Sequence, residues 1–183
     1  VALVGYTNAG KSTLFNRLTR ASVQAEDMLF ATLDPTLRNV TLPHGARILL
    51  SDTVGFISDL PTMLVSAFRA TLEEVLEADV VLHVRDISHE DTDAQSSDVE
   101  TILRDLGVDP NDHRRLMAVW NKLDLLDPER ATTVANNAAR RGNARPIVVS
   151  ALTGQGEAEL VHEIEDRLAQ GRPVFEVDLD PTD

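Results

Sequence analysis

The octapeptide GYTNAGKS at residues 5–12 constrains the fold of this chain more than any other segment. Its glycines let backbone N–H groups turn inward around a phosphate, and the compact ammonium of Lys11 reaches the terminal phosphates. Such a loop lies between a strand and a helix, because the first-turn amides of the helix complete the anion site. The apolar residues 1–4 and a helical pattern over residues 11–20 supply both elements.

Apolar, β-branched runs alternate with helical patterns along the rest of the chain. This alternation is typical of a doubly wound α/β sheet. Residues 36–42 and 47–52 flank Pro43, His44 and Gly45, which predicts a hairpin and hence one antiparallel strand. We therefore expect a three-layer α/β sandwich, with helices on both faces of a mostly parallel six-stranded sheet. The other five strands are expected at residues 1–4, 48–51, 80–84, 116–120 and 147–149.

Helical patterns fill the intervals between these strands. One of them repeats an apolar residue every four positions, at Leu60, Leu64, Phe68, Leu72 and Leu76. This pattern predicts a helix from Pro61 with a buried apolar stripe. Further helices are expected over residues 91–106, 128–141 and 156–170. We expect one domain over residues 1–171, followed by an extension, or the start of another domain, over residues 172–183.

Composition excludes several classes of protein. With 43% hydrophobic residues, 183 residues fit one core, and the absence of cysteine excludes disulfides and thiolate metal sites. A net charge of −13 opposes sequence-independent binding to nucleic acid, so we expect no DNA partner. No apolar run reaches membrane-spanning length, and we expect a monomer. Because the chain lacks an initiating Met and starts just before the phosphate loop, we interpret it as a fragment.

The segment DTVG at residues 52–55 follows an apolar strand. A carboxylate there can hold the water shell of Mg²⁺, to which Ser12 adds a hydroxyl, and the N–H of Gly55 can approach a terminal phosphate. A threonine between the two motifs must complete the metal shell and sense the γ-phosphate. Thr32 and Thr36 are both available; the apolar anchors around residue 30 favour Thr32, whereas Thr36 is better placed to start a strand.

The base-recognition motif is NKLD at residues 121–124, which follows the apolar run 116–120. The carboxylate of Asp124 can accept from the two N–H donors of guanine, and adenine offers no such pair. Lys122, the only lysine besides Lys11, would lay its stem over the base, and Asn121 would tie the loops together. The segment 150–152 would present backbone N–H groups to the guanine carbonyl. These patterns together predict a GTPase.

Phe56 stands where many GTPases place a glutamine that orients the attacking water. A phenyl ring cannot position water, so we expect slow hydrolysis that a partner or an ion accelerates. In the alternative interpretation Phe56 only packs the following segment. Asn8 offers an amide oxygen near the phosphates, which leaves K⁺ activation open. Arg38 and Arg69 could act in cis, although a solvated salt-bridge role is favoured for both.

Other polar residues receive structural interpretations. No two of the five histidines are spaced as a metal pair on a helix, and His83 lies within an apolar strand run, as an interior residue would. Trp120 is interpreted as a core residue. The acids between residues 73 and 79 are interpreted as the solvent-exposed face and the end of a helix.

The chain resembles the HflX family of translational GTPases, within the group that also contains Obg. The resemblance covers nearly the whole chain and rests on residues 5–12, FATLDP at 30–35, DTVGFI at 52–57, the stretch 59–74, and residues 121–124. It implies the fold of P-loop GTPases, and a cytoplasmic protein that binds the large ribosomal subunit and hydrolyses GTP under ribosome stimulation. Members split stalled or hibernating ribosomes. Leu37 and the pair Arg85 and Asp86 depart mildly from the family pattern.

Two alternatives to this function stay open from the sequence. One is a GTPase of ribosome assembly or RNA modification, and the other is the cytosolic G domain of a ferrous-iron transporter, against which residues 30–35 and 59–74 argue. The predicted catalytic residues are Lys11, Thr32 and Gly55, and the predicted Mg²⁺ ligands are Ser12, Thr32 and Asp52. The predicted residues for GTP or GDP are Gly5, Tyr6, Thr7, Asn8, Ala9, Gly10, Lys11, Ser12, Thr13, Phe30, Ala31, Thr32, Leu33, Asp34, Asp52, Thr53, Val54, Gly55, Asn121, Lys122, Leu123, Asp124, Ser150, Ala151 and Leu152.

Overall fold

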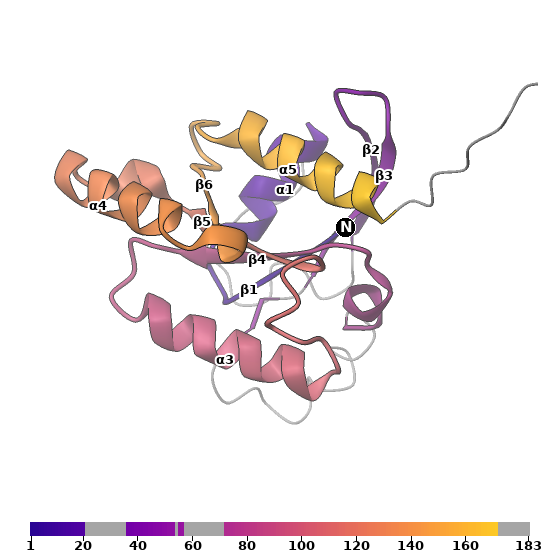
Figure 1. The fold of residues 1–183 in the computed structure, drawn as a ribbon, viewed down its shortest axis with the longest axis horizontal. Coiled ribbons are helices and arrows are strands. Elements are labelled where there is room, and N and C mark those ends of the chain that lie inside the picture. The colour runs from indigo at the N-terminus through magenta and orange to yellow at the C-terminus, as the bar shows by residue number, and fades with distance from the viewer. Residues whose placement is uncertain (21–35, 54, 57–71, 172–183) are drawn as a thin grey trace, which may run out of the picture.

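The computed structural model describes residues 1–20, 36–53, 55–56 and 72–171. Their strands form one six-stranded sheet in the order β2-β3-β1-β4-β5-β6 (Figure 1). All neighbouring strands pair in parallel except β2 and β3, which form the predicted hairpin. The predicted fold is therefore confirmed. The strands are β1 (Ala2–Gly5), β2 (Thr36–Thr41), β3 (Arg47–Asp52), β4 (Val81–Asp86), β5 (Leu116–Asn121) and β6 (Ile147–Val148).

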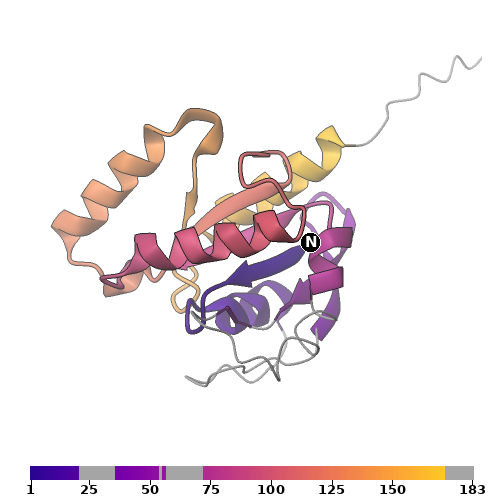
Figure 2. The same ribbon diagram turned by 90° about the horizontal axis from the view of Figure 1, so that it is seen from below.

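Helices cover both faces of this sheet. α1 (Lys11–Thr19) and α5 (Glu157–Gln170) lie on one face, and α3 (Thr92–Asp105) lies on the other, as the two views show (Figures 1 and 2). α4 (Pro128–Ala139) follows β5, and residues 72–77 are helical as well. In the described part of the chain, none of the helices is long and apolar enough to cross a membrane.

Alternation along the strands builds two main cores. Leu82 and Val84 of β4 pack with Phe15 of α1 and Ile164 of α5. On the opposite face, Val81 packs with the buried residues of α3. Because helices cover both faces of a parallel sheet, both sets of side chains leave water, which is the main source of stability for such a fold.

The predicted apolar stripe of the helix after residue 60 is wrong at its end. Leu72 is buried, but Leu76 is 42% exposed and the neighbouring Val75 takes the core position. The physical reason is the helical period, since a repeat of four residues turns about 40° further round an α-helix at every step. The start of this helix at Pro61, its residues up to 71, and Arg69 lie outside the described residues.

Candidate nucleotide-binding site

The predicted loops meet at one edge of the sheet. They follow the carboxyl ends of β1, β3, β5 and β6, which are parallel and therefore end on the same side. In the register of the sheet, Leu3 of β1 lies beside Asp52 of β3, and Asp86 of β4 lies beside Asn121 of β5. This edge thus brings together four of the predicted segments. Phe30, Ala31, Thr32, Leu33, Asp34 and Val54 lie outside the described residues.

The phosphate loop has a backbone that only glycine fits at two positions. A Cβ on Gly5 would lie 2.4 Å from the carbonyl oxygen of Val84, and one on Gly10 would lie 2.2 Å from the side-chain nitrogen of Asn121. Gly10 also has a φ of 95°, in the left-handed region, and it is the N-cap of α1. No side chain of the described residues caps this helix, so the first-turn amides are directed at the loop.

Lys11 is the buried cation of the site. It is 7% exposed, and burial lowers its pKa, although the nearby charge of Asp52 acts in the opposite direction. A buried ammonium is costly unless an anion faces it. The position of Lys11 at the start of α1 therefore suits a phosphate ligand.

Ser12 and Asp52 provide the oxygen atoms that a magnesium ion prefers. The Ser12 hydroxyl donates to Oδ2 of Asp52 over 3.0 Å, and Asp52 is fully buried. Thr53 fixes the end of β3, since its hydroxyl donates to the carbonyl oxygen of Leu3 over 2.6 Å. A hydroxyl beside a carboxylate is the donor set expected for Mg²⁺ in this class of site, so the residues present fit the ion.

Phe56 packs inside the protein. It is 1% exposed, in the cluster that contains Val4 and Val75. Its backbone forms a parallel bridge with Tyr6, its carbonyl accepts from the Thr7 N–H over 2.6 Å, and it also accepts from the Thr7 hydroxyl over 2.9 Å. Phe56 therefore fixes the segment that carries Gly55 beside the phosphate loop. Residues 57–71, which the packing alternative concerns, lie outside the described residues.

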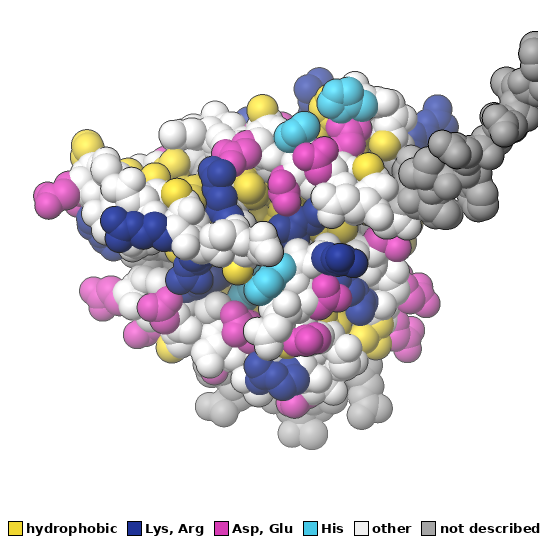
Figure 3. Space-filling model, in the orientation of Figure 1, with side chains coloured by type: hydrophobic (Ala, Val, Ile, Leu, Met, Phe, Trp, Pro, Cys, Tyr) yellow, Lys and Arg dark blue, Asp and Glu magenta, His cyan; other side chains and the backbone are white. Residues whose placement is uncertain are grey.

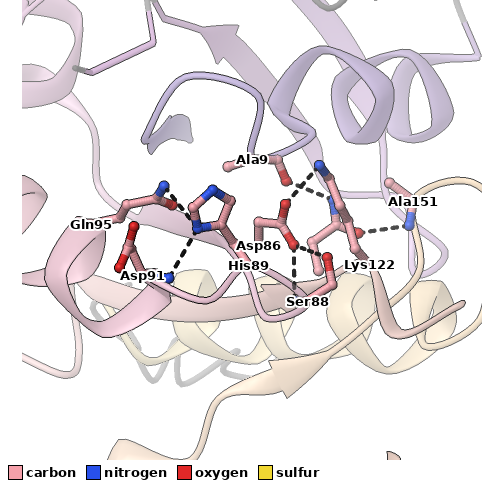
Figure 4. A network of polar contacts seen from close by, with 9 residues as sticks. Ala9, Asp86, Ser88, His89, Asp91, Gln95, Lys122 and Ala151 are labelled. Atoms are coloured by element: carbon pink, nitrogen blue, oxygen red, sulfur yellow. Dashed lines mark hydrogen bonds and ion pairs between the residues drawn. The ribbon is translucent and has the colours of Figure 1, made fainter. Parts of the chain in front are cut away.

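Asn121 joins the phosphate loop to the base-recognition loops through Ala9 and Ala151, the two partners that Figure 4 labels. Its side-chain nitrogen donates to the carbonyl oxygen of Ala9 over 3.0 Å, and its oxygen accepts from the backbone N–H of Ala151 over 2.9 Å. The residue is 2% exposed, so both bonds are shielded from water. These loops come from β1, β5 and β6, and the single amide fixes their spacing.

Asp124 is held by Ser150. The hydroxyl of Ser150 donates to Oδ1 of Asp124 over 2.6 Å, and its oxygen accepts from the N–H of Thr153. Asp124 lies in a short 3₁₀ helix, Leu123–Leu125, and its side chain is exposed to solvent. The carboxylate is thus oriented by the protein and accessible to a ligand. The N–H of Ser150 donates to Gln155, and that of Ala151 to Asn121.

Asp86 is a site residue that the sequence analysis missed. Its Oδ2 accepts from the Lys122 ammonium over 2.8 Å, and its Oδ1 accepts from the hydroxyl and the N–H of Ser88 (Figure 4). Burial raises the pKa of Asp86, but the hydrogen bonds from Lys122 and Ser88 outweigh it, so the pKa is lowered overall. Asp86 therefore stays charged and holds Lys122, whose backbone is left-handed with a φ of 70°. The sequence shows only that Asp86 follows the apolar run 80–84; its place beside Asn121 comes from the strand register.

Arg17 is a second residue that the sequence did not reveal. From α1 it donates to the carbonyl oxygens of Ala151 and Leu152, over 2.6 and 2.7 Å. It thereby binds the base-recognition segment to the helix that follows the phosphate loop. Leu152 itself is 70% exposed.

Comparison with known proteins agrees with this geometry. A family model described as 50S ribosome-binding GTPase matches residues 1–122, two thirds of the chain. The chain belongs to this family of GTPases.

Curated relatives confirm the predicted resemblance to HflX. GTPase HflX of Magnetococcus marinus is 51% identical over 183 residues, which is 100% of this chain and 40% of the relative. GTPase HflX of Escherichia coli is 43% identical and covers 92% of this chain, which matches 38% of that protein. The chain thus spans about 40% of the length of these relatives.

Solved structures show the same fold. Era in complex with MgGDPNP and nucleotides 1506–1542 of 16S ribosomal RNA superimposes with a TM-score of 0.74. It is 25% identical, and the match covers 97% of this chain and 59% of Era.

Proposed function

We propose that this chain binds GTP and GDP together with Mg²⁺ and hydrolyses GTP to GDP and phosphate. The observation that carries this proposal is the pair of hydrogen bonds made by Asn121, to Ala9 and to Ala151. One buried side chain fixes the distance between a loop suited to phosphates and a carboxylate suited to guanine. Such a fixed distance serves a ligand that carries both groups.

Each residue of the site has a role in this proposal. Lys11 and the first-turn amides of α1 bind the phosphates, and Ser12 and Asp52 would hold Mg²⁺ together with Thr32. The ion neutralises charge on the phosphate oxygens when bound. Gly55 lies close against the phosphate loop, since a Cβ there would lie 3.0 Å from Cα of Thr7, and its N–H would donate to the γ-phosphate.

Guanine specificity is assigned to Asp124. Its carboxylate accepts from the ring N–H and the amino group of guanine, and a site built to pair with donors rejects a base that lacks them. Inosine diphosphate loses one of these donors, and adenosine diphosphate offers no such pair.

The test is calorimetry with four nucleoside diphosphates: GDP, inosine diphosphate, ADP and xanthosine diphosphate (XDP). The wild type should prefer GDP over ADP and XDP by about a hundredfold or more. Asp124→Asn should reverse the order for XDP, because the amide donates to the xanthine carbonyl that replaces the guanine amino group. Glu129 is an exposed acid on α4, five residues after Asp124, and Glu129→Gln should keep the wild-type order. Equal affinity of the wild type for all four nucleotides would overturn the proposal.

We infer that hydrolysis by the chain alone is slow. The ring of Phe56 lies in the core, so it cannot orient an attacking water. A ribosomal partner, or a K⁺ ion bound near Asn8, would provide the missing stabilisation of charge. Single-turnover rates in K⁺ and Na⁺ buffers, each with and without ribosomes, separate these two sources. A rate that neither addition changes would refute this inference.

We propose further that the full-length protein acts on the large ribosomal subunit in the cytoplasm, where it splits ribosomes. The family description and the HflX relatives support this proposal. Cosedimentation of the full-length protein with separated subunits should show GTP-dependent association with the large one. Association with the small subunit alone would favour the ribosome-assembly alternative, and no association in any nucleotide state would contradict both.

A further inference from the structure

The face of the sheet toward α3 carries polar residues where a covered parallel sheet is normally apolar. His83 and Arg85 alternate on β4, and Arg85 lies directly beside Trp120 of β5 in the strand register. His83 is 3% exposed and Trp120 is 7% exposed. Burial lowers the pKa of His83 from 6.5 to about 3, and the charge of Arg85 adds to this shift, so the imidazole is neutral at pH 7. The positive charge on this face therefore comes from arginine.

A cavity of about 100 Å³ lies over these strands. The described residues that line it include four arginines, Arg85, Arg141, Arg145 and Arg167, and one acid, Glu100. A lining with more basic than acidic residues is unusual in a chain with 30 acidic and 17 basic residues. Figure 3 shows several dark-blue side chains near the middle of the molecular surface, in the region between α3, α4 and α5 of Figure 1.

Two buried donors at this cavity have no acceptor among the described residues. They are Nε1 of Trp120 and Nε of Arg85. The guanidinium carbons of Arg85 and Arg141 lie 5.7 and 5.0 Å from the centroid of the indole ring, so the ring holds both cations nearby. A buried donor without an acceptor is costly, and an anion in the cavity would remove this cost at both nitrogens.

One arginine of the lining has no acidic partner within the part of the chain that the structure describes. Arg85 bonds to Asp93 over 2.7 Å, Arg145 to Glu159 over 3.0 Å, and Arg167 to Glu163 over 2.8 Å. Arg141 forms no ion pair with another described residue. Its charge is therefore available to a ligand at the mouth of the cavity.

We propose that this cavity binds a phosphate group. The phosphate accepts hydrogen bonds from Trp120 and Arg85 and forms an ion pair with Arg141. A tetrahedral oxyanion offers acceptors in several directions, which suits donors that approach from β4, β5 and the end of α4. The cavity is the size of a small ion. Free inorganic phosphate and a backbone phosphate of RNA share this chemistry, and the experiment separates them.

Trp120 is the only tryptophan of the chain, so its fluorescence reports directly on the cavity. The whole chain, saturated with GDP and Mg²⁺ to occupy the phosphate loop, is titrated with inorganic phosphate. A parallel titration uses potassium chloride at matched ionic strength. Phosphate should change the tryptophan emission saturably, and chloride should not.

Two adjacent arginines provide matched variants. Arg141→Gln should weaken phosphate binding about tenfold or more, since it removes one charge-assisted bond. Arg140→Gln removes the same charge one residue away, at an exposed position that does not line the cavity, and should bind like the wild type. Thermal unfolding of both variants checks that they fold.

The outcomes are distinct for each source of the phosphate. Saturation by inorganic phosphate and by a short RNA, both weakened by Arg141→Gln, identifies a site open to RNA backbone; saturation by inorganic phosphate alone identifies a site for a small anion. An equal response to chloride and phosphate, or equal binding by the Arg140 and Arg141 variants, would overturn the proposal and leave the cavity to water.

Discussion

Neighbouring residues of two strands serve two contrasting regions of the molecule. Asp86 and Asn121 end β4 and β5 at the nucleotide edge. Asp86 accepts from Lys122, and Asn121 donates to Ala9 and accepts from Ala151. The residues just before them, Arg85 and Trp120, lie at the cavity on the α3 side, and each has a buried nitrogen without a partner in the described part of the chain. One step along the chain thus separates a closed polar network from an open one.

The difference shows how a fold prepares sites for ligands in two ways. At the nucleotide edge, bonds within the protein fix Asn121 and Lys122 before the ligand arrives, so little ordering remains to oppose binding. At the cavity, buried donors without acceptors raise the free energy of the ligand-free protein. A ligand that accepts from them removes this cost, which strengthens its binding. The first region depends on its bonds to other loops, and the second on burial and charge.

The largest effect is expected from breaking the closed network at Asn121. Asn121→Ala leaves the Ala9 carbonyl and the Ala151 N–H without their partner, which should lower the free energy of unfolding by about 3 kcal/mol. GDP affinity should fall by about a hundredfold, because the two loops lose their fixed spacing. Urea unfolding and calorimetry measure the two effects. Asn136→Ala on the exposed side of α4 serves as the control, and wild-type stability of the Asn121 variant would show that the network is dispensable.

The second effect tests burial in the open region through acid sensitivity. The pKa of His83 is about 3 in the folded protein and 6.5 as the ordinary value of a histidine. As the pH falls below 6.5, this imidazole therefore takes up a proton in the unfolded chain while it stays neutral in the folded protein. Stability is therefore lost between these values, by ~2 kcal/mol at pH 5. In phosphate-free buffer, His83→Gln should lose that much less stability than the wild type between pH 7 and pH 5. His113→Gln, which removes an exposed histidine at the rim, should follow the wild type; equal acid loss in the His83 variant would refute burial as the cause.

The smallest effect compares two carboxylates, one from each region. Asp86→Asn removes the charge that holds Lys122 and should weaken GDP binding about tenfold. Asp93, the acidic partner of Arg85, has a side chain that is 96% exposed, and Asp93→Asn should leave GDP binding unchanged. Calorimetry on both variants sharpens the contrast. Identical affinities for the Asp86 variant and the wild type would mean that Lys122 needs no anchor.

The closed region was largely predictable from sequence, because its motifs specify backbone geometry locally. The backbone of the phosphate loop requires glycine at residues 5 and 10, and the apolar run before Asn121 indicates a strand end. The role of Asp86 could not be predicted, since it depends on the register that sets β4 beside β5. Trp120 was correctly interpreted as buried, yet only the structure shows that its indole N–H has no acceptor among the residues described.

The parallel register of β4 and β5 has a consequence for how this sequence can vary. Successive side chains of a strand point to opposite faces, so a single inserted or deleted residue in either strand would turn the indole toward the nucleotide loops and the Asn121 amide away from them. Substitutions can alter each region separately, but changes of length within these strands disturb both at once. Length variation among related chains should therefore fall in the connecting loops.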